Sequence, residues 1–143
     1  MTTSHERDFY RWAMEQADLL RSGRLSEIDV EHLIEEIENM GRSERRELES
    51  RFKVLITHLL KWRFQPSYRG RSRALTIKEQ RRAIAHLLKD NPSLKAHLED
   101  ILNDAYELAI LAAARETGLD ERTFPSICPW ESGQVLDTGF LPD

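Results

Sequence analysis

Cysteine is nearly absent from this sequence, since Cys128 is the only one among 143 residues. A single thiol excludes an intrachain disulfide and any metal site built from several thiolates. Long apolar runs are missing as well: the longest covers residues 108–114, whereas a membrane-crossing helix needs ~20 apolar residues. The first residues also lack the apolar segment of a secretory signal. We therefore expect a cytoplasmic protein.

Sequence motifs of the common catalytic classes are also missing. The chain has no glycine-rich phosphate loop, no Ser-His-Asp order and no His-x3-His pair. Cys128 has no base near it in the sequence, so we expect a small apolar anchor rather than a nucleophile. We therefore expect neither a cofactor nor a complete catalytic constellation.

Helical periodicity is present almost throughout, and neither β-type alternation nor an internal repeat interrupts it. The expected helices cover residues 8–22, 29–40, 43–64, 76–89 and 93–118. A continuous helix bent at Gly41 is the alternative to separate second and third helices. Prolines and glycines break the period from Leu119 onward, although residues 130–137 can form one more short helix.

These segments predict an all-α, single-domain bundle of about five main helices with an irregular C-terminal tail. The bundle would cover residues 8–118, and residues 119–143 would pack on it as the tail. With 40% hydrophobic and 32% charged residues, the chain suits one core under a well-solvated surface. The first two helices should bury their apolar stripes in this core, and Gln16 should be a buried hydrogen-bonding amide.

Capping residues fix several of the expected helix starts. Asp29 offers an N-cap oxygen to the second helix, and Ser93 caps the fifth. Thr76 and Glu79 have the spacing of a capping box, which predicts that the fourth helix begins there and that residues 67–74 form a loop.

Several stretches resemble a known family. Chief among them are DFYRWAMEQADLLRSGRLSEID, LIEEIENMGRSERREL, HLLKW, TIKEQRR and the closing FLP. Together they are similar to the bacterial family catalogued as domain of unknown function twenty-nine, found in cyanobacteria and proteobacteria. The resemblance covers nearly the whole chain in the same order and implies a small all-helical bacterial protein. It implies no activity and no functional residues.

The segment KWRFQPSYRGRSR, residues 61–73, interleaves aromatic rings with cations and is a candidate for binding nucleic acid. The candidate anion-binding residues are Tyr68, Arg69, Arg71, Arg73 and Arg82. However, residues 27–49 contain nine carboxylates and three arginines, so internal ion pairing is the favoured interpretation. In that interpretation the arginines lie in a loop that reaches the acidic second helix, and Trp62 is part of the core. Only Phe64 and Tyr68 would then be free to stack on the bases of a nucleic acid.

Three carboxylates on the second helix form a candidate metal site. Glu31, Glu35 and Glu38 follow each other at i, i+4 and i+7, which places them on one side of a helix. Oxygen-rich clusters of this kind bind Mg²⁺, as in all-α nucleotide phosphohydrolases. Those enzymes add a Glu-x-x-Asp on a later helix, which this chain lacks, and Arg42 offers Glu38 a simpler partner.

The leading hypothesis is a non-enzymatic interaction module that binds another protein or itself through its tail. The tail carries more apolar surface than a disordered segment would. These apolar residues are Phe124, Ile127, Trp130, Val135, Leu136, Phe140 and Leu141. Alternatively, the tail wraps the bundle and completes its core. Nucleic-acid binding through residues 61–82 and metal-dependent phosphohydrolysis are the alternative functions.

Overall fold

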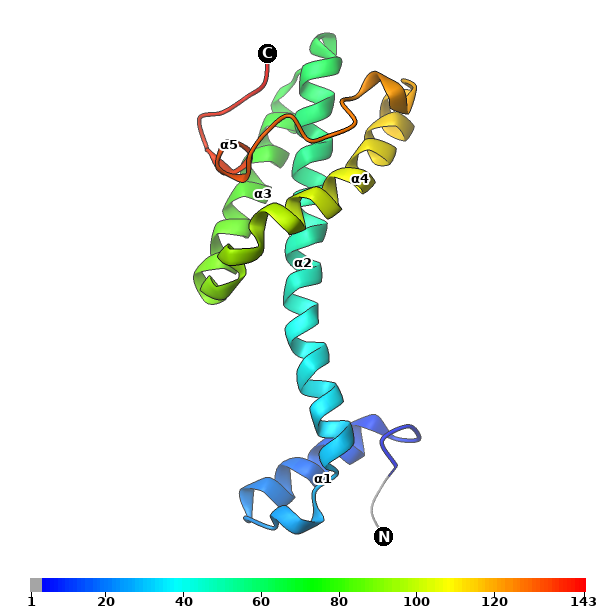
Figure 1. Ribbon diagram of the computed structural model, residues 1–143, viewed down its shortest axis with the longest axis vertical. Helices are drawn as coiled ribbons and strands as arrows, with labels where there is room; N and C mark the ends of the chain where they lie inside the picture. The colour runs from blue at the N-terminus through cyan, green and yellow to red at the C-terminus, as the bar shows by residue number, and fades with distance from the viewer. Residues whose placement is uncertain (1–3) are drawn as a thin grey trace. The chain divides into compact units, whose positions relative to one another are not determined.

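A computed structural model describes residues 4–143, and every regular element in that range is helical (Figure 1). The α-helices are α1 (Phe9–Arg21), α2 (Val30–Phe64), α3 (Arg71–Asp90), α4 (Leu98–Thr117) and α5 (Ser132–Leu136). Short 3₁₀ turns cover Leu25–Glu27, Pro66–Tyr68, Pro92–His97 and Glu121–Thr123. The predicted all-α class with an irregular C-terminal tail is confirmed.

The chain divides into two compact units, Met1–Arg42 and Ser43–Asp143, called here the first and the second unit. Helix α2 contributes residues to both, because it continues without interruption through Gly41. The prediction of separate helices over residues 29–40 and 43–64 is therefore wrong, and the continuity of the alternative, though not its bend at Gly41, is confirmed. A Cβ placed on Gly41 would meet no atom within 4 Å, so the glycine is there without a packing requirement.

Helix α3 begins earlier than predicted, so the expected loop at residues 67–74 and the capping box at Thr76 are wrong. The helix starts at Arg71, directly after its N-cap Gly70. Thr76 lies inside the helix, where its hydroxyl donates to the carbonyl of Ser72 at 3.0 Å. Arginine, alanine and leucine between residues 71 and 75 are good helix formers, so the start moves back to the glycine. The cap expected at Ser93 is also wrong, because a 3₁₀ turn precedes α4.

The core of the second unit is built by α2, α3, α4 and the tail. Helix α2 buries Leu48, Phe52, Leu55 and Leu59 completely, as its wide apolar stripe predicts. Ile84 from α3 and Ala105 from α4 belong to the same cluster. Helix α4 ends at Gly118, whose φ of 75° is the left-handed conformation that glycine adopts readily.

The C-terminal segment completes this core. In Figure 1 it runs back from the end of α4 across the helices of the second unit toward α3. Phe124, Trp130 and Val135 are buried in the core cluster. The Tyr106 hydroxyl of α4 donates to the carbonyl of Pro125 at 2.5 Å. The tail is therefore held by apolar burial and by hydrogen bonds to its backbone.

Candidate functional site

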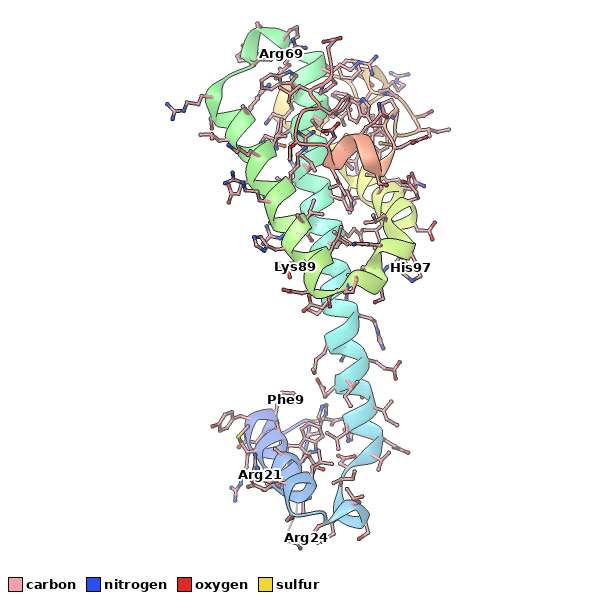
Figure 2. The ribbon with its side chains drawn as sticks, turned by 90° about the vertical axis from the view of Figure 1, so that its left-hand side faces the viewer. Phe9, Arg21, Arg24, Arg69, Lys89 and His97 are labelled. Atoms are coloured by element: carbon pink, nitrogen blue, oxygen red, sulfur yellow. The ribbon has the colours of Figure 1, made fainter. Side chains whose placement is uncertain are left out.

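Two arginines of the basic segment, Arg69 and Arg73, are engaged by the end of α2 rather than by carboxylates, whereas Lys61 forms an ion pair with Glu116 of α4 at 3.5 Å. Pro66 has no N–H, so the carbonyl of Trp62 cannot receive the usual i+4 hydrogen bond. Arg69, at the turn between α2 and α3 (Figure 2), donates to this carbonyl through Nε at 2.7 Å, and its guanidinium lies 5.6 Å from the Trp62 ring. A cation at a helix C-terminus is also favoured by the helix dipole.

Arg73 acts at the same helix end. Its Nη1 donates to the carbonyl of Lys61 at 3.3 Å and its Nη2 to the side-chain oxygen of Gln65 at 3.0 Å. The expectation that these arginines reach the acidic second helix from a loop is wrong. Arg71 and Arg73 belong to α3, and the partners of Arg69 and Arg73 are backbone and amide oxygens. Carbonyl oxygens at the end of α2 thus hold both arginines in place of distant carboxylates, although only the Trp62 carbonyl lacks a backbone donor, since that of Lys61 also accepts from the N–H of Gln65.

The other residues predicted to bind nucleic acid differ in their exposure to solvent. Trp62 packs against the core, as predicted. Phe64 does so too and meets the Phe124 ring edge-on at 5.2 Å, so the expectation of a free Phe64 ring is wrong. Tyr68 is exposed beside Arg73, and Arg71 and Arg82 are exposed on α3. Nucleic-acid binding by Tyr68, Arg71 and Arg82 stays a prediction, with two of its five residues occupied.

The predicted metal residues lie on one exposed side of α2. Glu31, Glu35 and Glu38 are solvent-exposed, and Arg42 contacts Glu38 at 3.5 Å, as the i+4 spacing predicts. Within residues 4–143, no three side chains of the His, Cys, Asp and Glu types are grouped as a metal would require. The carboxylates therefore form an acidic border on the helix.

Cys128 is half-buried in the tail. Its Sγ donates to the carbonyl of Trp130 at 3.3 Å. Burial raises the pKa of the thiol, so little thiolate forms at neutral pH. The environment is that of the packed anchor that the sequence predicts.

A polar cluster fastens α1 to the start of α2 in the first unit. The carboxylate of Asp29 accepts from the Trp12 indole at 3.0 Å and from the His32 ring at 2.7 Å. Its backbone N–H donates to the side-chain oxygen of the buried Gln16 at 2.7 Å, which confirms the predicted buried amide. Asp29 also accepts from the backbone N–H of His32 at 3.4 Å, as an N-cap does.

This cluster predicts that the stability of the first unit, and with it the protection of its amides from hydrogen exchange, depends on pH. Burial alone would raise the pKa of Asp29, but hydrogen bonds from His32 and Trp12 lower it, and the Asp29 hydrogen bond raises the pKa of His32. The stabilisation is then greatest between pH ~4 and ~6.5. It is lost as the pH rises through the raised His32 pKa, and again as it falls through the lowered Asp29 pKa. Amide hydrogen exchange of residues 4–42, corrected for the pH dependence of the intrinsic exchange rates, measures this change. A His32→Gln variant is the control, because it should not lose stability as the pH rises above ~6.5.

The first unit leaves most of its apolar side chains in solvent. Among its described residues only Trp12 and Gln16 are buried. On α2, the exposed fractions are 52% for Val30, 52% for Ile34 and 64% for Ile37. These three residues are spaced i, i+4 and i+7, so they lie on one side of the helix. The prediction that this stripe is core is wrong, because α1 contacts Asp29, directly before α2, and the side of α2 that carries His32.

Carboxylates line one edge of this apolar surface. Each of Val30, Ile34 and Ile37 is followed directly by Glu31, Glu35 or Glu38, about 100° further round the helix. We call these six residues the acid-flanked face. The first unit as a whole has ten carboxylates and five arginines. An apolar strip in an acidic field is therefore its main surface feature.

Apolar side chains of α1 and its 3₁₀ turn are exposed in the same unit. They are Phe9, Tyr10, Met14, Leu20 and Leu25. The sequence predicts the stripes themselves correctly, but not that they stay uncovered. The available signal was length, since a segment of about 40 residues cannot enclose a core by itself.

None of the described helices is both long and apolar enough to cross a membrane. The fold and the exposed surface define a small all-α protein with an acid-flanked apolar helix face. The chain belongs to the family described as Domain of unknown function DUF29, whose model matches residues 4–141. This match confirms the family resemblance of the sequence. No curated protein and no solved structure matches the chain.

Proposed function

We propose that this protein is an interaction module whose first unit binds an amphipathic helix with cationic flanks on another protein. The observation that carries this proposal is the exposure of Val30, Ile34 and Ile37 at more than half of their surface. Apolar anchors at i, i+4 and i+7 are the pattern by which helices dock against one another. Burying each such side chain contributes about 1.5 to 3 kcal/mol.

The small size of the first unit supports the need for a partner. Units of about 40 residues usually require a disulfide, a metal or association with another chain for stability. The sole cysteine lies outside this unit, and the described residues contain no metal-binding group. Association is the route that remains.

Charge indicates what kind of partner fits. Glu31, Glu35 and Glu38 would repel a second acidic helix laid along the same strip, and a second copy of residues 30–40, which hold four glutamates and no lysine or arginine, is such a helix. Lysine or arginine beside the apolar residues of the partner would instead complement these carboxylates. A basic amphipathic helix therefore fits the acid-flanked face better than self-association does.

The test uses two synthetic amphipathic helices with the same apolar face, one flanked by lysines and the other by glutamates. We expect the lysine-flanked peptide to bind the protein, and the glutamate-flanked peptide to bind at least about tenfold more weakly. An Ile37→Asp substitution should weaken binding of the lysine-flanked peptide by at least about tenfold, because it places a charge on the apolar strip. Isothermal titration calorimetry measures both effects.

The matched control is Ile127→Asp, which changes an apolar residue of the second unit that is 78% exposed. This variant should bind the peptide as the unchanged protein does. Equal affinity for both peptides, or equal loss in both variants, would contradict the proposal. If light scattering showed a dimer for the unchanged protein and for Ile127→Asp but a monomer for Ile37→Asp, the face would bind a second copy of the chain instead of a basic partner.

A further inference from the structure

A hollow of about 510 Å³ lies between α3 and the C-terminal segment of the second unit. Its size is within the range of small-molecule sites. Three cations, Lys78, Arg81 and Arg82, stand beside the apolar Ile77 and Leu141 in its lining. The lining of this hollow thus combines apolar side chains with positively charged ones.

A second hollow of about 340 Å³ shares Arg81 with the first. Lys89 and Lys95 supply its other cations, and Ile84, Leu88 and Leu136 are among its apolar lining. Lys89 lies at the end of α3 far from Arg69 (Figure 2), so the two hollows follow α3 for much of its length. Neither a carboxylate nor an aromatic ring occurs among the described residues that line them.

Arg81 is the unusual residue at the centre, because it is a cation that is only 5% exposed. Its Nε donates to the carbonyl of Val135 at 2.8 Å and its Nη2 to that of Phe140 at 2.7 Å. It contacts no carboxylate within 4 Å among the described residues; Asp137 acts on it only from a distance. A buried charge without a counter-ion is costly.

One part of the Arg81 guanidinium remains available. Its Nη1 makes no hydrogen bond to the described residues. Among those residues, His5 Nδ1 is the only side-chain nitrogen or oxygen that is both inaccessible to solvent and without a hydrogen-bond partner. Arg81 Nη1 is therefore accessible to solvent. Arg81 lines both hollows. Lys78 and Arg82 are exposed and form no ion pair in the described part of the chain.

We propose that the larger hollow binds an amphipathic anion, a carboxylate or phosphate group attached to an apolar chain. The anionic group would be held by Arg81 Nη1 together with Lys78 and Arg82. The apolar chain would lie on Ile77 and Leu141 and extend toward the second hollow. The anion supplies the missing counter-charge of Arg81, and the apolar chain covers apolar side chains that a simple inorganic anion would leave in water.

The lining argues against single-stranded nucleic acid as the ligand of this site. Such ligands are bound by stacking of bases on exposed aromatic rings along a cationic groove. The hollows offer cations but no ring among their described lining residues.

The test compares decanoate and decyl phosphate with the neutral decanol and with inorganic phosphate, each titrated into the full chain below its micelle concentration. We expect saturable binding of at least one of the two amphipathic anions, and at least about tenfold weaker binding of decanol and of inorganic phosphate. The two anions distinguish a carboxylate from a phosphate preference. Equal affinity for decanol, or no saturable binding of either anion, would overturn the proposal.

Substitutions locate the site without disturbing Arg81, whose hydrogen bonds hold the tail. Arg82→Glu and Lys78→Glu should each raise the Kd of the preferred anion by at least about tenfold. Arg71→Glu is the matched control, because Arg71 is an exposed cation of the same helix outside the lining of either hollow. An equal loss in Arg71→Glu, or displacement of the anion by a single-stranded oligonucleotide, would assign the binding to the general basic surface of α3 and overturn the proposal.

Discussion

Replacing Trp130 with alanine is expected to lower the free energy of unfolding of the second unit by about 3 to 5 kcal/mol. Trp130 is 7% exposed, belongs to the core cluster and packs against the Phe140 ring at 6.1 Å. Alanine would leave a cavity beneath the tail, and the loss is a large fraction of the stability of small domains, which is about 5 to 15 kcal/mol. Urea denaturation followed by far-ultraviolet circular dichroism measures the change.

Ile127 provides the control for this substitution, because it is an apolar residue of the same tail that is 78% exposed. Ile127→Ala should change the unfolding free energy by no more than about 0.5 kcal/mol. If the two variants were equally stable, the tail would not be part of the core. Truncation after Gly118 extends the same test, and we expect it to abolish cooperative unfolding of the second unit.

Tyr106 is expected to make the second unit sensitive to alkaline pH. Its burial raises the pKa of the phenol to about 12, against about 10 in an unfolded chain. The folded state therefore retains the proton where the unfolded state releases it. The contribution is fully present below pH ~10 and is lost as the pH rises toward 12, with a total of about 2 to 3 kcal/mol.

The measurement is the difference in unfolding free energy between the unchanged protein and Tyr106→Phe from pH 8 to 12. At pH 8 the variant should be less stable by about 1 to 2 kcal/mol, because the carbonyl of Pro125 loses its donor. The gap should narrow or reverse above pH 10, since phenylalanine cannot ionise. A gap that stays constant with pH would mean that Tyr106 is exposed to solvent when it titrates.

Much of the helical architecture could be predicted from periodicity. Leu48, Phe52 and Leu55 mark the central stripe of α2 in the second unit, and they are fully buried. The same spacing continues through Val30, Ile34 and Ile37, where the side chains are exposed. Hydrophobic periodicity identifies the apolar face of a helix but not whether another element covers that face. The covering decides whether an apolar stripe belongs to the core or forms a binding surface.

The basic segment shows a second limit of sequence reasoning. Charge counts match Arg69 and Arg73 with carboxylates, because carboxylates are the only opposite charges in a sequence. In the structure both arginines donate to carbonyls at the end of α2 instead, and the one that Arg69 contacts, on Trp62, has no backbone donor. Pro66 was the available signal, since it removes the N–H that would otherwise satisfy Trp62. The pairing of Arg81 with the tail carbonyls left no such signal.

The position of Cys128 has a practical consequence. The thiol is half-buried two residues before Trp130 and donates to its carbonyl, so a reagent reaches it fully only when this segment detaches. Because it is the sole cysteine, its reaction with a thiol reagent reports on this segment alone. Labelling by a disulfide reagent should therefore accelerate in any variant or condition in which the segment opens more often, without any engineered probe.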